Sequence, residues 1–119
     1  MKMETAFKTF LTKHNYSNFD IKAILFDMDG VLYDSMKWHA KSWKQVMDEN
    51  DISSTADEFY LYEGQVGRNT IDSVIRRERG RAATEEEKNS IYKRKTELFS
   101  LYNDGSLIPY AYEFVSKIK

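Results

Sequence analysis

The chain has 119 residues, of which 41% are hydrophobic and 31% charged, a length and composition typical of one small globular domain. Its net charge of −1 gives no overall field favouring nucleic acid or an anionic membrane, and no apolar stretch reaches transmembrane length. The absence of cysteine excludes disulfides and thiolate metal sites. With no secretory pattern at its start, we expect a cytoplasmic protein without nucleic-acid or membrane partners.

The first third of the chain contains a predicted helix and a predicted strand. Residues 5–13 have the apolar spacing of a short amphipathic helix. Residues 21–27 predict a β-strand, and its continuous apolar run is typical of a strand buried on both faces of a parallel sheet. Because one strand cannot bury both of its faces alone, we expect its partners to lie in sequence beyond Lys119.

Apolar spacing predicts four helices in the middle of the chain. Two of them begin with a capping box, Thr55 with Glu58 and Thr84 with Glu87, and Gly80 ends a third. The basic run around Gly80 is interpreted as a solvated helix end, because no aromatic interleaving accompanies it. The four helices are expected over residues 35–49, near 56–62, over about 69–79 and from Thr84 to about 102.

Two aspartates, Asp27 and Asp29, end the predicted strand, and Gly30 follows them. Residues i and i+2 of a strand point to the same side, so both carboxylates converge at the tip where open α/β sheets bind ligands. Mg²⁺ could offset the two charges. Asp27 is the candidate nucleophile and Asp29 the candidate acid/base, while Gly30 lets backbone N–H groups approach a phosphate. The alternative interpretation is a simple turn, with Asp34 or Ser35 capping the next helix.

The complete string from Ile24 to Ser35 resembles the first motif of the haloacid dehalogenase-like (HAD) phosphohydrolase superfamily. The order of strand, Asp-x-Asp-Gly, helical insertion and Leu107-Ile108-Pro109 before a last helix resembles its β-phosphoglucomutase branch. His39 and Trp43, four residues apart, match the usual His and Trp of that branch. The resemblance implies an α/β fold, with a HAD-like Rossmann core and an inserted four-helix cap.

The same resemblance implies a reaction. It implies Mg²⁺-dependent phosphoryl transfer from a small phosphorylated metabolite, such as a sugar phosphate, through an aspartyl-phosphate on Asp27. Asp29 would be the acid/base, and both aspartates would bind the metal, Asp29 through its backbone carbonyl. Gly30 and His39 would contact the substrate. Whether water or a second sugar hydroxyl accepts the phosphoryl group, as in a phosphatase or a mutase, stays open.

The sequence departs from the family pattern in the cap. The family often carries Gly-Arg-Thr to hold the far end of the substrate. Here one alignment places Gln65 at the position of that arginine, whereas the other uses Gly67 and Arg68. Arginine binds an anionic oxygen pair with two parallel hydrogen bonds and glutamine does not, so the choice affects substrate class. Lys95 best matches the family's cap lysine, and Arg68 and Lys95 are our candidate cap contacts.

We therefore expect residues 1–19 to be an N-terminal helical extension and 20–34 the first core strand with its catalytic loop. Residues 35–104 are expected to be the helical cap and 105–119 the return to the core. Only the first strand and a following helix of the core would be present, so the chain should be mostly helical. The family's later motifs are missing before Lys119. The alternative hypothesis is accordingly a non-catalytic remnant or helical interaction module.

Overall fold

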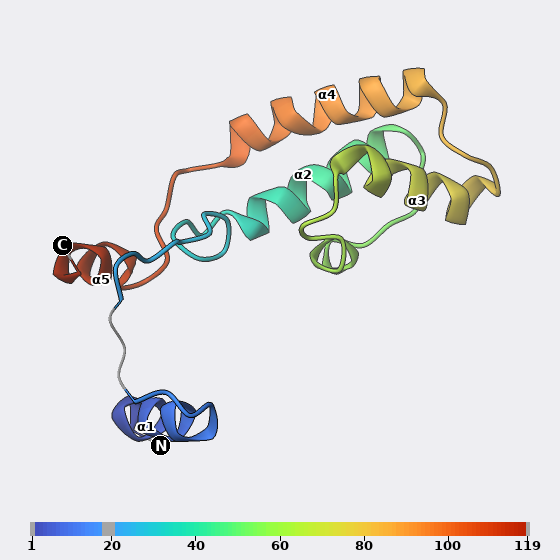
Figure 1. Cartoon of the computed structure of the whole chain (residues 1–119). Coiled ribbons are helices and arrows are strands. Elements are labelled where there is room, and N and C mark those ends of the chain that lie inside the picture. The colour runs from blue at the N-terminus through green and yellow to red at the C-terminus, as the bar shows by residue number, and fades with distance from the viewer. Residues whose placement is uncertain (1, 18–20, 119) are drawn as a thin grey trace.

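The computed structural model describes residues 2–17 and 21–118 and is mostly helical (Figure 1). No helix within these ranges combines the length and the apolar character needed to cross a bilayer. The elements in chain order are α1 (Met3–Lys13), α2 (Met36–Glu49), the 3-10 helix η1 (Asp57–Tyr60), α3 (Gly67–Arg79), α4 (Glu85–Tyr102) and α5 (Ala111–Lys117).

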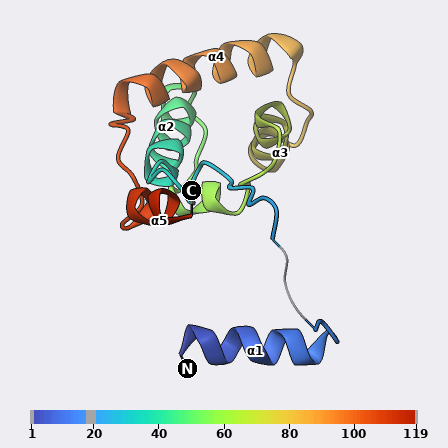
Figure 2. The same cartoon turned by 60° about the vertical axis from the view of Figure 1, so that its left-hand side comes forward.

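Helices α2, α3 and α4 and the short η1 form one packed unit. Helix α2 lies along α4 and also packs on η1, while α3 packs on α4 (Figures 1 and 2). Within the described residues, α1 packs on none of the other helices. The unit buries one apolar core made of Ala40, Trp43, Val46, Met47, Ile52, Phe59, Ile71, Val74, Ile75, Ala83, Ile91 and Leu98. Each large side chain in such a core contributes about 1.5–3 kcal/mol of burial free energy.

The capping boxes have different outcomes. Thr84 accepts a hydrogen bond from the Glu87 backbone, and the Glu87 side chain accepts one from the Thr84 backbone, so α4 begins where predicted. Thr55 and Glu58 exchange the same pair of bonds. The helix expected over 56–62 is nevertheless only the single-turn η1, in which Phe59 alone is buried. One buried side chain cannot support a longer helix.

The arginines of the basic run around Gly80 form ion pairs and hydrogen bonds with neighbouring groups. Arg77 pairs with Glu58 and donates to the Ser53 carbonyl, while Arg79 and Arg81 both pair with Glu87. These contacts join the C-terminal end of α3 to the loops around it. They agree with the interpretation of this run as a helix end.

The strand expected over residues 21–27 does not form. The described residues contain no β-strand, and only isolated bridges join Tyr33 to Asp29 and to Leu107. A strand needs a neighbour for its N–H and C=O groups, and the described part of the chain offers none. The apolar side chains of this segment are therefore exposed, and Leu25 has 94% of its surface accessible.

Helix α5 follows Pro109, as predicted, but it has no buried residue. Val115 and Ile118 were expected to face inward, yet Val115 is half-buried and Ile118 is exposed. The physical reason is the same as for Leu25, since no described element covers this side. A shallow apolar groove lies here instead, between α5 and the turn that contains Val31 and Leu32.

The two segments that lead into and out of the helical unit are joined to each other. The Asp34 N–H donates to the Ser106 carbonyl at 2.8 Å, and the Ile108 N–H donates to the Leu32 carbonyl at 2.9 Å. Both ends of the unit are thereby held beside the turn that follows Asp27 and Asp29. This arrangement places α2 and α4 next to the two aspartates.

Candidate active site

A tight turn carries the two aspartates. The N–H groups of Val31, Leu32 and Tyr33 all donate to the Met28 carbonyl, and the Gly30 N–H donates to the Tyr33 carbonyl at 2.9 Å. Gly30 has a φ of +73°, a conformation that side chains disfavour, and an added Cβ would lie 3.1 Å from Met36 Cγ. The backbone therefore favours glycine at this position, and a larger residue would also have to displace the Met36 side chain.

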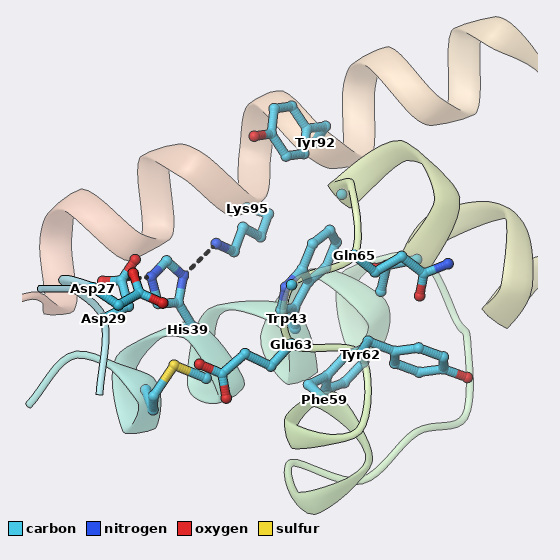
Figure 3. Close-up of a pocket in the computed structure, with 14 residues that line it drawn as sticks. Asp27, Asp29, His39, Trp43, Phe59, Tyr62, Glu63, Gln65, Tyr92 and Lys95 are labelled. Atoms are coloured by element: carbon cyan, nitrogen blue, oxygen red, sulfur yellow. Dashed lines mark hydrogen bonds and ion pairs between the residues drawn. The ribbon is translucent and has the colours of Figure 1, made fainter. Parts of the chain in front are cut away.

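The aspartates line a cavity of about 330 Å³ between this turn and the helical unit (Figure 3). Figure 3 shows Asp27, Asp29 and His39 at one end, and Gln65 and Tyr62 toward the other. The middle of the cavity is aromatic, with Trp43 and Phe59 stacked at a centroid distance of 5.8 Å. The lining residues are Asp27, Asp29, Met36, His39, Trp43, Phe59, Tyr62, Glu63, Gly64, Gln65, Gly67, Thr70, Tyr92 and Lys95.

Asp29 is positioned by the start of α2. The buried Ser35 hydroxyl donates to Asp29 Oδ1 at 2.5 Å, and His39 Nε2 lies 3.5 Å from the same oxygen. Ser35 occupies the N-cap position of α2 as the alternative interpretation expected, but its side chain forms no capping hydrogen bond and contacts Asp29 instead. Asp27 is exposed, and its Oδ1 accepts a hydrogen bond from the Met28 N–H at 2.7 Å. Asp29 is thus the more constrained of the two carboxylates.

His39 connects Asp29 to Lys95. Lys95 Nζ lies 2.8 Å from His39 Nδ1, and the His39 ring stacks on Phe99 at a centroid distance of 4.0 Å. Burial, and then the neighbouring Lys95 charge, lower the pKa of His39 below its ordinary value. Because an ammonium group can only donate, Nδ1 of the neutral ring accepts and the ring proton sits on Nε2, facing Asp29. Burial also lowers the pKa of Lys95 to about 8.

Replacing Lys95 by methionine should change how stability depends on pH. Folded Lys95 loses its proton near pH 8, whereas the unfolded chain keeps it until about pH 10.5. Between these values the unfolded state binds more protons, so wild-type stability should rise with pH relative to Lys95→Met. Urea unfolding of both proteins measures the difference, with Lys93→Met as the control for losing an exposed charge of α4. A difference that stays constant across this range contradicts the assigned burial.

The structure brings together four of the six predicted site residues. Asp27, Asp29, His39 and Lys95 line one cavity, and Gly30 lies in the turn beside it. Arg68 lies elsewhere, because its guanidinium pairs with Glu85 and donates to Asn89. This geometry does not support Arg68 as a residue that contacts the cavity. Gln65, the other candidate for the position of the family's cap arginine, does line the cavity.

Sequence reasoning missed two polar groups of the site. Ser35 was read only as a possible cap, because its distance from Asp29 depends on how the turn closes. Glu63 was not singled out, although it lines the cavity and lies next to Gly64 in the segment compared with the family's cap loop. The sequence signal that could have identified Glu63 was its position two residues before Gln65, a candidate residue of the cap loop.

The fit of the site to Mg²⁺ is partial. Carboxylate oxygens suit this ion, which is usually bound by one or two carboxylates together with water and substrate phosphate. Asp27 and Asp29 could supply that share. Within residues 2–17 and 21–118, no group of three or more histidine or acidic side chains is close enough to hold a metal ion.

Comparisons with known proteins agree with this architecture. Residues 21–119 match the family model described as haloacid dehalogenase-like hydrolase. Over 55 residues the chain is 29% identical to the β-phosphoglucomutase of Bacillus subtilis (strain 168), a match covering 46% of this chain and 24% of that protein. A solved structure described as "Putative beta-phosphoglucomutase from Bacteroides vulgatus" superposes with a TM-score of 0.80 and 45% identity, covering 97% of this chain and 47% of that one.

The match of 99 residues to one family model, together with the superposition, identifies the class. The chain belongs to the haloacid dehalogenase-like hydrolases, and its structural neighbours are of the β-phosphoglucomutase type. The expected fold class is confirmed by these comparisons. The chain spans about a quarter of the length of the curated relative and about half that of the solved one.

Proposed function

We propose that this chain carries the nucleophile and the cap of a Mg²⁺-dependent phosphoryl-transfer enzyme acting on a small phosphorylated metabolite, with a sugar phosphate among the candidates. The observation that carries the proposal is the cavity itself. Asp27 and Asp29 line one end of it, and His39 and Lys95 from α2 and α4 face them. Membership of the HAD-like hydrolases supports phosphoryl transfer in general.

In the proposed reaction, an Asp27 carboxylate oxygen attacks the phosphorus of the substrate. The bond from phosphorus to the leaving oxygen breaks, and Asp29 gives a proton to that oxygen. Ser35 and His39 hold Asp29 in place for this transfer. Asp29 then removes a proton from the acceptor hydroxyl that attacks the aspartyl-phosphate. Mg²⁺, held by the Asp27 carboxylate and the Asp29 backbone carbonyl, would offset the charge of the phosphate oxygens.

In this proposal residues 35–104 act as the cap, and residues 20–34 and 105–119 belong to the core. The cavity lies between these two parts, so the cap residues His39 and Lys95 reach the substrate only when the parts are together. The hydrogen bonds between Asp34 and Ser106 and between Leu32 and Ile108 lie where the parts join. Closure of such a cap excludes water from the reacting groups.

The experiment measures phosphate release by the protein as its gene encodes it, across a panel of phosphorylated metabolites. We expect release with Mg²⁺ and its loss in EDTA, because the phosphate charge is then uncompensated. Acid quenching followed by mass spectrometry should find the phosphoryl group on Asp27. Release that persists in EDTA, or a phosphoryl group on another residue, contradicts the mechanism. No release from any substrate favours the alternative of a non-catalytic helical module.

A further inference from the structure

The cap end of the cavity lacks an anion-binding side chain. Among the described residues that line the cavity, the basic side chains are Lys95 and His39, and His39 lies at the aspartate end beside Asp29. Lys95 is directed to the aspartate end, where it contacts His39. Arg68, the arginine nearest to Gln65 in the sequence, pairs with Glu85 and donates a hydrogen bond to Asn89 outside the cavity.

The part of the cavity between the aspartates and the far end carries a further negative charge. Glu63 lines the cavity, and its Oε1 lies 4.0 Å from where a Cβ on Gly30 would sit, so its carboxylate faces the turn of the aspartates. Figure 3 shows Glu63 between that turn and the aromatic wall. The far end is neutral, with the Gln65 amide and the Tyr62 ring. The described lining therefore has three carboxylates against one ammonium group.

A phosphomutase that works through a sugar bisphosphate must bind a second phosphate. While one phosphate reacts, the enzyme has to hold the other at the far end of the sugar. Arginine serves this purpose well, because its guanidinium binds two anionic oxygens at once. An amide carries no charge to offset that of a second phosphate, and a carboxylate in the same cavity repels one where water is excluded. Transfer to water needs one phosphate site and no such clamp.

We infer that this site passes its phosphoryl group to water and not to a second sugar phosphate, and that Glu63 and Gln65 set this preference. The inference rests on the proposed function, and it assigns the protein to the phosphohydrolases within it. In the second step a water oxygen bonds to the phosphorus of the aspartyl-phosphate. Asp29 takes a proton from that water, the bond between phosphorus and the Asp27 oxygen breaks, and phosphate leaves.

The first test uses the protein as its gene encodes it and compares phosphate release with isomerisation in one reaction mixture. β-Glucose 1-phosphate with a trace of glucose 1,6-bisphosphate is followed by ³¹P NMR, which separates free phosphate from glucose 6-phosphate. We expect phosphate release to exceed isomerisation by at least about tenfold, a difference on the order of 1.4 kcal/mol in barrier. Isomerisation as fast as release, and lost in Asp27→Asn, keeps the proposed function and overturns this inference. If neither phosphate release nor isomerisation occurs, the proposed function fails for this sugar. The binding experiment described next then tests the inference by itself.

The binding test uses calorimetry with glucose 6-phosphate and glucose 1,6-bisphosphate. The wild-type protein should bind the bisphosphate no more tightly than the monophosphate. Gln65→Arg should tighten bisphosphate binding about tenfold by supplying the missing clamp. Leu61→Arg adds the same charge on a side chain that is 86% exposed and outside the cavity, and it should change neither affinity. A wild-type preference for the bisphosphate above about tenfold, or equal effects of the two arginines, overturns the inference.

Discussion

Asp27→Asn should lower turnover by at least about 10³-fold while leaving the fold intact. An amide is a poor nucleophile, so the covalent step cannot begin. The structural cost should be small, because Asp27 is exposed and accepts a hydrogen bond from the adjacent Met28 N–H, a bond that an amide oxygen can also accept. Steady-state phosphate release by both proteins, with helical circular dichroism during heating, measures the two quantities.

The matched control for this change is Asp48→Asn. Asp48 lies on α2, is exposed and forms an ion pair with Lys44, so the same chemical change removes a surface ion pair worth at most about 1 kcal/mol. Turnover should stay within about twofold of wild type. If Asp27→Asn keeps most of its activity, Asp27 is not the nucleophile and the proposed mechanism is wrong.

Leu98→Ala should destabilise the helical unit by about 2–5 kcal/mol. Leu98 is only 1% exposed and lies in the core that α4 forms with α2 and α3. Its truncation removes buried methyl groups and leaves a cavity that the packed neighbours fill incompletely. Since small domains are only marginally stable, this loss should be large relative to the total. Urea unfolding followed by the helical circular dichroism signal gives the free energy of unfolding.

Leu101→Ala is the matched control on the same helix. Leu101 is 74% exposed, so the identical substitution three residues later removes little buried surface. We expect a change within about 0.5 kcal/mol of zero. Equal effects of the two substitutions would show that α4 does not pack on the core through the Leu98 face.

The site depends on both the turn and the helical unit. Asp29 comes from the turn, but Ser35, at the start of α2, and His39, within it, determine where its carboxylate points. Lys95 comes from α4 and reaches the same group through His39. A movement of the helical unit relative to the turn would therefore change the surroundings of Asp29, the proposed acid/base. This dependence is the structural basis for treating residues 35–104 as a cap in the proposed function.

Local signals in the sequence were sufficient for the helices. Apolar spacing located α2, α3 and α4 to within a few residues, because each of these helices buries one face in a core that the chain itself supplies. The Thr84–Glu87 box marked the start of α4 and Gly80 the end of α3, since both are contacts within a few residues. The Asp-x-Asp-Gly motif likewise identified the aspartates that line the cavity.

Contacts between distant residues were decided only by the tertiary structure. How the helices pack determines three such contacts. They are the hydrogen bond from Ser35 to Asp29, the position of Glu63 over the Gly30 turn and the ion pair of Arg68 with Glu85. The strand predicted for residues 21–27 failed for a related reason. A helix satisfies its own backbone hydrogen bonds, whereas a strand requires a neighbour, and no described segment provides one. The sequence by itself therefore determined the helices and the pair of aspartates that lines the cavity, and only the packing decided which side chains surround that pair.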